Sequence, residues 1–192
     1  MEKFEFDDIS FNEDTRILYE GHNVKGMNLS PEAFPLFMTT AFNMGNLENV
    51  AHTYDVKGYT YIRTRNPNRK ALADIITYLE QGQDTLIFSS GMGAITTTYF
   101  ALFQPGDHMI CNSNIYGETF DAITSLVKNY GVETDFVPFD DLEAVKAAVR
   151  PNTKMLYTEV ASNPTDRLCD IEELAKIAHA ANALLMVDNT FT

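Results

Sequence analysis

From Pro67 onward, short apolar segments alternate with segments whose apolar residues recur every three or four positions. The first pattern is typical of buried strands and the second of amphipathic helices. Leu184–Val187 is an uninterrupted apolar run, as expected for a strand covered on both faces. The alternation predicts an α/β fold with a mainly parallel sheet and helices on both faces. We predict strands at 85–88, 108–111, 132–137, 154–158 and 184–187, and helices from Pro67 and at 93–103, 117–129, 141–149 and 171–181.

Two of the predicted helices carry start signals. Asp140 has Glu143 three residues later, and Asp170 has Glu173 at the same spacing. Both pairs resemble a capping box in which Asp replaces the usual Ser or Thr and accepts hydrogen bonds from the first-turn amides. We therefore expect Asp140 and Asp170 to be helix N-caps.

The first 66 residues have a different character. They contain Pro31, Pro35, scattered glycines and only short apolar pieces. This composition predicts an extended amino-terminal arm with brief helical turns rather than a packed layer. We therefore divide the chain into an arm, 1–66, and the amino-terminal part of a sheet-containing domain, 67–192.

The charge balance limits the partners of the chain. Its 192 residues include 14 basic and 27 acidic side chains, for a net charge of −13. Such an acidic surface argues against nucleic acid or an anionic membrane as partner. The start of the chain has no signal-peptide pattern, and Cys111 and Cys169 are far apart, so we expect reduced thiols and a cytoplasmic location.

Polar clusters follow four of the predicted strands. They lie at 89–93, 112–116, 159–163 and 188–190. Because the carboxyl ends of parallel strands meet at one edge of a sheet, and ligands of such sheets bind there, we expect these clusters to surround one site.

The segment Ser89–Ile95 joins a predicted strand to a predicted helix and contains two glycines. Amides at a helix start have no intrahelical partner, so they suit an anion such as phosphate. The alternative is a tight turn that serves only close packing. A dinucleotide-binding domain is disfavoured, since the third glycine of that fingerprint is missing and no ribose-binding acid is evident.

Several polar residues at this edge permit two interpretations each. Asp188 has no accompanying His or Cys cluster, which argues against a metal and favours a cationic heterocycle as its partner. Tyr116 is a half-buried aromatic or a stacking face for a planar ring. Asn163 is a turn residue before proline or a donor to a ring oxygen. On the arm, Arg63 is a solvated charge or, with Tyr61, a phosphate ligand.

Six motifs together resemble the Cys/Met-metabolism family of pyridoxal-phosphate (PLP) enzymes. This family includes cystathionine γ-synthases, cystathionine lyases, O-acetylhomoserine sulfhydrylases and methionine γ-lyases. The resemblance runs from about Thr15 to the last residue and implies the large domain of fold type I. The motifs lie at 35–42, 61–67, 89–94, 116–119, 159–164 and 187–190, in the order of the family.

The resemblance implies a role for each residue at the sheet edge. Gly91 and Met92 would donate backbone amides to the cofactor phosphate. Tyr116 would stack on the pyridine ring, and Asn163 would bond its phenolic oxygen. Asp188 would pair with the pyridinium nitrogen and keep it protonated.

The resemblance also implies a shared site. In the family, the residues that match Tyr61 and Arg63 reach the phosphate of the neighbouring subunit's cofactor. We therefore expect a homodimer or tetramer that acts on an amino-acid substrate, with the arm folded against a partner subunit.

Two departures from the family pattern stand out. The chain stops at Thr192, before the family's Schiff-base lysine and carboxyl-terminal domain, so no catalytic residue is assigned within it. Glu118 stands where methionine γ-lyases typically have Cys and most other members have Gly. Its carboxylate either faces the substrate side chain or points to solvent.

The expected function is PLP-dependent elimination or replacement at the β or γ carbon of sulfur-containing or O-acylated amino acids, carried out by a complete subunit. This is the chemistry of trans-sulfuration in methionine and cysteine metabolism. The alternative is a truncated, non-catalytic half-subunit that at most binds the cofactor or a partner, because the lysine is missing.

Overall fold

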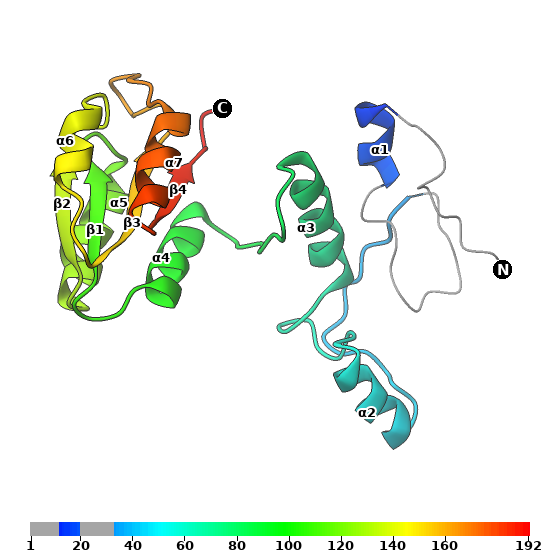
Figure 1. Ribbon diagram of the computed structural model, residues 1–192. Coiled ribbons are helices and arrows are strands. Elements are labelled where there is room, and N and C mark those ends of the chain that lie inside the picture. Colours follow the sequence, from blue (N-terminus) through cyan, green and yellow to red (C-terminus); the bar gives the residue numbers. More distant parts are fainter. Residues whose placement is uncertain (1–11, 20–32) are drawn as a thin grey trace. The chain divides into compact units, whose positions relative to one another are not determined.

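The computed structural model describes residues 12–19 and 33–192. The chain forms two compact units, Met1–Ile87 and Phe88–Thr192, which we call the arm unit and the sheet unit. Each is described by itself (Figure 1). The division predicted at residue 66 stays a prediction. Within the described residues, no helix is both long and apolar enough to cross a bilayer.

The sheet unit contains a four-stranded sheet in the order β2-β1-β3-β4 (Figure 1). Every neighbouring pair is parallel, which confirms the predicted parallel sheet. The carboxyl ends of all strands therefore point to the same edge. The strands are β1 (His108–Asn112), β2 (Glu133–Val137), β3 (Thr153–Glu159) and β4 (Leu184–Asp188).

Helices pack on both faces of this sheet, as predicted. One buried cluster joins α4 (Gly91–Leu102) and the π-helical turn η2 (Ile123–Val127), which directly follows α5 (Gly117–Ala122), to one face. A second cluster joins α6 (Leu142–Ala147) and α7 (Ile171–Ala180) to the other. The predicted helix 117–129 is thus continuous in extent, with the π turn inside it.

Strand alternation assigns the side chains to these two faces. In β3, Tyr157 packs in the cluster under α4, while Leu156 packs in the cluster under α7. The ring of Tyr99 from α4 meets the ring of Tyr157 edge-on at 6.0 Å between centroids. Since side chains two residues apart share a face, Glu159 lies on the same face as Tyr157.

The helix caps confirm one expectation and correct another. Asp170 is the N-cap of α7, where its carboxylate accepts from the Glu173 amide at 3.1 Å. Asp140 is not a cap, and the prediction is wrong by one residue. Asp141 caps α6 by accepting from the amides of Glu143 and Ala144. Asp140 instead pairs with Arg167 at 2.9 Å.

The predicted strand at 85–88 is also wrong. This segment makes no ladder with any strand that the structure describes, and Leu86 is 78% exposed. An apolar run is suited to a strand, but a strand also needs a neighbour for its backbone hydrogen bonds. Neither edge strand, β2 or β4, supplies one to this segment.

The arm unit contains α1 (Glu13–Tyr19), α2 (Leu47–Asp55) and α3 (Pro67–Leu79). The helix predicted from Pro67 is confirmed, with proline in the first turn and Asn66 as N-cap. Residues 1–11 and 20–32 of the predicted arm, including Pro31, lie outside the described residues.

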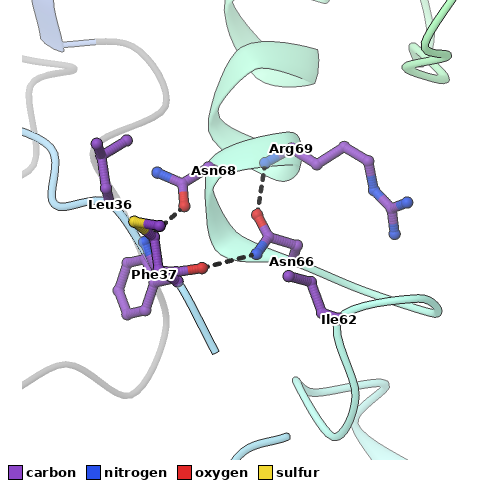
Figure 2. Close-up of a pocket in the computed structure, with 7 residues that line it drawn as sticks. Leu36, Phe37, Ile62, Asn66, Asn68 and Arg69 are labelled. Carbon is purple, nitrogen blue, oxygen red and sulfur yellow. Dashed lines mark hydrogen bonds between the residues drawn. The ribbon is translucent and has the colours of Figure 1, made fainter. Parts of the chain in front are cut away.

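Two asparagines attach the chain around Phe37 to the start of α3 (Figure 2). Asn68 Oδ1 accepts from the Phe37 amide at 2.8 Å, and Asn68 Nδ2 donates to the Pro35 carbonyl at 2.8 Å. Asn66 Nδ2 reaches the Phe37 carbonyl at 3.4 Å. These bonds shape an open pocket lined by Leu36, Phe37, Met38, Ile62, Asn66, Asn68 and Arg69. None of the predicted cofactor ligands lines it.

Candidate functional site

The amino terminus of α4 presents free amides. Ser90 is its N-cap, and its Oγ accepts from the Gly93 amide at 3.1 Å. No residue in the described part of the chain accepts from the amides of Gly91 and Met92. A Cβ added at Gly91 would meet nothing within 4 Å, whereas one at Gly93 would lie 3.0 Å from the Ser90 Oγ. Two amide donors without a protein acceptor at the start of a helix suit an anion.

Tyr116 lies between β1 and α5, where its ring is 42% exposed. Its backbone amide is fixed, because it donates to Glu159 Oε1 at 2.5 Å. A hydrogen bond to the Glu118 carboxylate raises the pKa of the Tyr116 phenol above its ordinary value. The exposed Glu118 side chain therefore lies beside the Tyr116 hydroxyl. Whether its carboxylate faces the substrate side chain stays a prediction.

Asp188 ends β4, and its carboxylate is held from two sides. Oδ1 accepts from the amide of Thr190 at 3.1 Å and from its hydroxyl at 2.5 Å. Oδ2 accepts from the Tyr157 hydroxyl at 3.4 Å. Burial raises the pKa of Tyr157, which keeps this phenol protonated as a donor. Among the described residues, the half-buried carboxylate is therefore oriented by neutral donors and has no ion-pair partner.

Thr119 connects the start of α4 with the sheet. The hydroxyl of this buried residue of α5 lies 3.6 Å from Met92 Sδ and also faces the Tyr157 phenol oxygen, and its single proton can be donated to one of the two at a time. Since Tyr157 in turn contacts Asp188, a line of polar contacts runs from the Met92 side chain at the start of α4 to the end of β4.

Asn163 lies in the loop after β3, which is closed by Ser162. The Ser162 carbonyl accepts from the Asp166 amide at 2.8 Å, and its amide donates to the Arg167 carbonyl at 3.0 Å. The backbone amide of Asn163 faces the Glu159 carboxylate and favours its charged form. The Asn163 side chain is exposed, and within residues 33–192 it has no hydrogen-bond partner.

The structure therefore brings most of the predicted residues to one edge of the sheet unit, where Met92, Tyr116 and Asp188 are joined through shared neighbours. Tyr61 and Arg63 belong to the arm unit. There the Arg63 guanidinium lies over the Tyr61 ring, 4.9 Å from its centroid.

Three residues at this edge were not singled out from the sequence: Thr119, Tyr157 and Glu159. A signal existed for Glu159, because it is a carboxylate at the end of an apolar strand, as Asp188 is. Thr119 and Tyr157 carried no such signal, since a threonine in a helix and a tyrosine in a strand are ordinary.

Two of the curated proteins similar to this chain are gamma-lyases. L-methionine gamma-lyase of Fusobacterium nucleatum is 38% identical over 162 residues, which are 83% of this chain and 41% of the relative. Cystathionine gamma-lyase of Bacillus subtilis is 44% identical over 134 residues, which are 70% of this chain and 35% of the relative.

Solved structures show the same fold. Cystathionine gamma-lyase from Lactobacillus plantarum, complexed with L-serine, matches with a TM-score of 0.83 at 33% identity, over 94% of this chain and 45% of that chain. A candidate O-acetylhomoserine (thiol)-lyase from Campylobacter jejuni, which carries a pyridoxyl-lysine phosphate, also matches at 0.83, with 30% identity over 94% and 44% of the two chains.

The family assignment rests on nearly the whole sequence, although the chain spans less than half the length of each of these relatives. The family model "Cys/Met metabolism PLP-dependent enzyme" matches residues 14–192. The α/β fold and the ordered contacts at the sheet edge agree with that match. The chain therefore belongs to the Cys/Met metabolism family of PLP-dependent enzymes.

Proposed function

We propose that the protein supports elimination or replacement at the β or γ carbon of sulfur-containing or O-acylated amino acids. The observation that carries this proposal is the shared location of the free α4 amides, Tyr116 and Asp188 at the carboxyl edge of one parallel sheet. The names of the relatives, methionine and cystathionine gamma-lyases, support the substrate class.

The groups at this edge fit the parts of pyridoxal phosphate. The unpartnered amides of Gly91 and Met92 suit its phosphate, because they combine free donors with the positive end of a helix. The exposed ring of Tyr116 offers a stacking face, and the exposed Asn163 amide is available to a ring oxygen. When bound, the cofactor withdraws electrons from the substrate's α carbon.

Asp188 would hold a proton on the ring nitrogen of the cofactor. A carboxylate beside a protonated heterocycle stabilises the charged form of both groups. The bonds from Thr190 and Tyr157 hold this carboxylate in place before any ligand arrives. Such preorganisation reduces the cost of orienting the group on binding.

For the arm, we propose that Tyr61 and Arg63 contact the cofactor phosphate of a partner subunit, so that the active site is shared in a homodimer or a larger assembly. Their conformation supports this role. The amides of Thr64 and Arg65 both donate to the Tyr61 carbonyl, and Arg69 donates to the Thr64 carbonyl at 2.9 Å. The turn that carries the two side chains is therefore held on α3.

Absorbance tests the cofactor part of the proposal. The protein expressed from its complete gene should gain a visible band with pyridoxal phosphate, and Asp188→Ala should weaken or shift that band. Asp140→Ala is the matched control, since Asp140 forms an exposed ion pair with Arg167 and is not a proposed cofactor ligand. Absence of a visible band in the wild-type protein would sink the proposal.

Product analysis tests the reaction. Release of a thiol, ammonia and an α-keto acid from L-methionine or cystathionine, with uptake of water, indicates elimination, in which the bond from sulfur to the β or γ carbon breaks and sulfur leaves as the thiol. Formation of a new thioether from an O-acylated amino acid and a thiol indicates replacement. Cofactor binding with neither product would favour the non-catalytic alternative.

A further inference from the structure

Glu159 is a buried carboxyl group without a cationic partner. It ends β3 and is 4% exposed, and within the described part of the chain it takes part in no salt bridge. Its Oε2 atom is buried without a hydrogen-bond partner among the described residues. Burying a carboxyl group in this way is unfavourable, so its presence calls for a compensating role.

Three neighbours of Glu159 are proposed cofactor ligands. Oε1 accepts the short hydrogen bond from the Tyr116 amide, and the Asn163 amide faces the same carboxylate. Asp188 is its direct register partner on β4. One buried side chain therefore stands between the residue proposed to stack on the ring, the residue proposed to bind its oxygen, and the residue proposed to face its nitrogen.

The location of Tyr116 makes the bond from Glu159 important. Tyr116 is the N-cap residue of α5, but its side chain makes no capping hydrogen bond, and α5 itself has 6 residues. A large part of its ring is exposed, so neighbouring side chains hold it only in part. The hydrogen bond from the Tyr116 amide to Glu159, 43 positions along the chain, thus helps to hold the Tyr116 backbone and so the position of its ring.

We propose that Glu159 is a positioning residue of the cofactor site, which sets the stacking position of Tyr116 through its backbone amide. The proposal rests on the proposed function, because it assigns Glu159 a task toward pyridoxal phosphate. Glu159 acts as a hydrogen-bond acceptor in this role, and a negative charge is not required. Burial, together with the nearby charge of Asp188, raises the pKa of Glu159 and favours its neutral form.

Three substitutions at Glu159 separate the contributions of its hydrogen-bond acceptor, its charge and its side-chain length. Glu159→Gln keeps the acceptor oxygen and removes the charge. Glu159→Met keeps a similar length and removes the acceptor. Glu159→Asp keeps the charge but is one methylene shorter, so its carboxylate falls short of the Tyr116 amide.

The measurements are the dissociation constant for pyridoxal phosphate and the circular dichroism that the bound cofactor induces in the visible range. Both are made on the protein from its complete gene. Loss of a hydrogen bond to a carboxyl group is expected to weaken cofactor affinity about tenfold in Glu159→Met. Its induced dichroism should fall as well, because that signal reports the orientation of the ring. Glu159→Asp should show a smaller loss of both, and Glu159→Gln should restore most of both.

A stability control separates positioning from general damage. Leu174→Ala removes a fully buried side chain of α7, which packs on the opposite face of the sheet. It should lower the melting temperature while the folded protein keeps its cofactor affinity and dichroism. If Glu159→Met does not fold, Glu159→Asp and Glu159→Gln still decide between the outcomes.

The outcomes are distinct. A wild-type protein that binds the cofactor, with Met and Asp variants that match it in affinity and dichroism, overturns the positioning role alone. The same conclusion follows if the Gln variant is as impaired as the Met variant, because acceptance by oxygen would then not matter. A wild-type protein that binds no cofactor overturns both this inference and the proposed function.

Discussion

The Tyr157 hydroxyl donates to Asp188 Oδ2 across 3.4 Å, from one parallel strand to the next. Tyr157 is fully buried, and its ring is fixed edge-on against Tyr99. A donor held this firmly orients the Asp188 carboxylate from behind, while the Thr190 amide and hydroxyl hold its other oxygen. The geometry leads to the first prediction.

Tyr157→Phe should weaken pyridoxal phosphate binding several-fold without unfolding the protein. The phenylalanine ring fills nearly the same space, so the packing is kept, and the loss is limited to the phenol's contacts with Asp188 and Thr119, at about 1 kcal/mol for a hydrogen bond. A cofactor titration followed by absorbance, together with thermal unfolding, measures both effects. Equal affinity in the two proteins would show that Asp188 needs no donor from Tyr157.

Gly91→Ala should separate folding from ligand binding. The added methyl group meets nothing within 4 Å, so the free energy of unfolding should change by less than about 0.5 kcal/mol. The same methyl group occupies the space in front of the free amides and should weaken cofactor binding strongly. Thr97→Ala, at an exposed position within α4, is the control and should leave the affinity unchanged.

Asp141→Ala should lower the free energy of unfolding by about 1 kcal/mol, because it removes the N-cap of α6. Asp140→Ala is its direct neighbour and removes only an exposed ion pair with Arg167, which is worth between about 0 and 1 kcal/mol. Urea denaturation of both variants measures the difference. A larger loss for Asp140→Ala would contradict the observed cap.

His108 should make stability depend on pH. It is fully buried at the start of β1, where Nδ1 lies 2.8 Å from Thr153 Oγ1 and Nε2 lies 3.3 Å from Asp135 Oδ2. Burial, together with the charge of Arg150, lowers the pKa of His108 from its ordinary 6.5, although Asp135 and Glu133 oppose this.

The protein should lose stability as the pH falls, because the folded and unfolded states bind a proton at His108 at different pH values. As the pH falls below about 6.5, the unfolded chain binds a proton at His108 before the folded protein does. The stability linked to this group is therefore complete above that pH and is lost as the pH falls toward the lowered pKa. Chemical denaturation between pH 7 and 5 should show a shallower loss for His108→Asn than for wild type.

Local sequence patterns predicted most of the sheet unit. Apolar runs and helical periodicity located its four strands and the helices between them, and the Asp170 cap was correct because its partner amide is three residues away. The parallel order then followed from alternation, and with it the location of Tyr116 and Asp188 at the carboxyl edge of the sheet.

Tertiary structure decided what depends on distant partners. The segment 85–88 is apolar but has no neighbouring strand among those described, which no local pattern could reveal. Asp140 and Asp141 are both suitable caps by residue type, and the packing of α6 selects the second.

Glu159 shows the same division most clearly. Its sequence context identifies the end of a buried strand, but its hydrogen-bond partner lies 43 positions away on another loop. The chain by itself determined the fold class, the family and the edge of the sheet where a ligand would bind. Only the folded protein decided which carboxylate stays open and which is buried behind Tyr116, because strand register brings together groups that are remote in sequence.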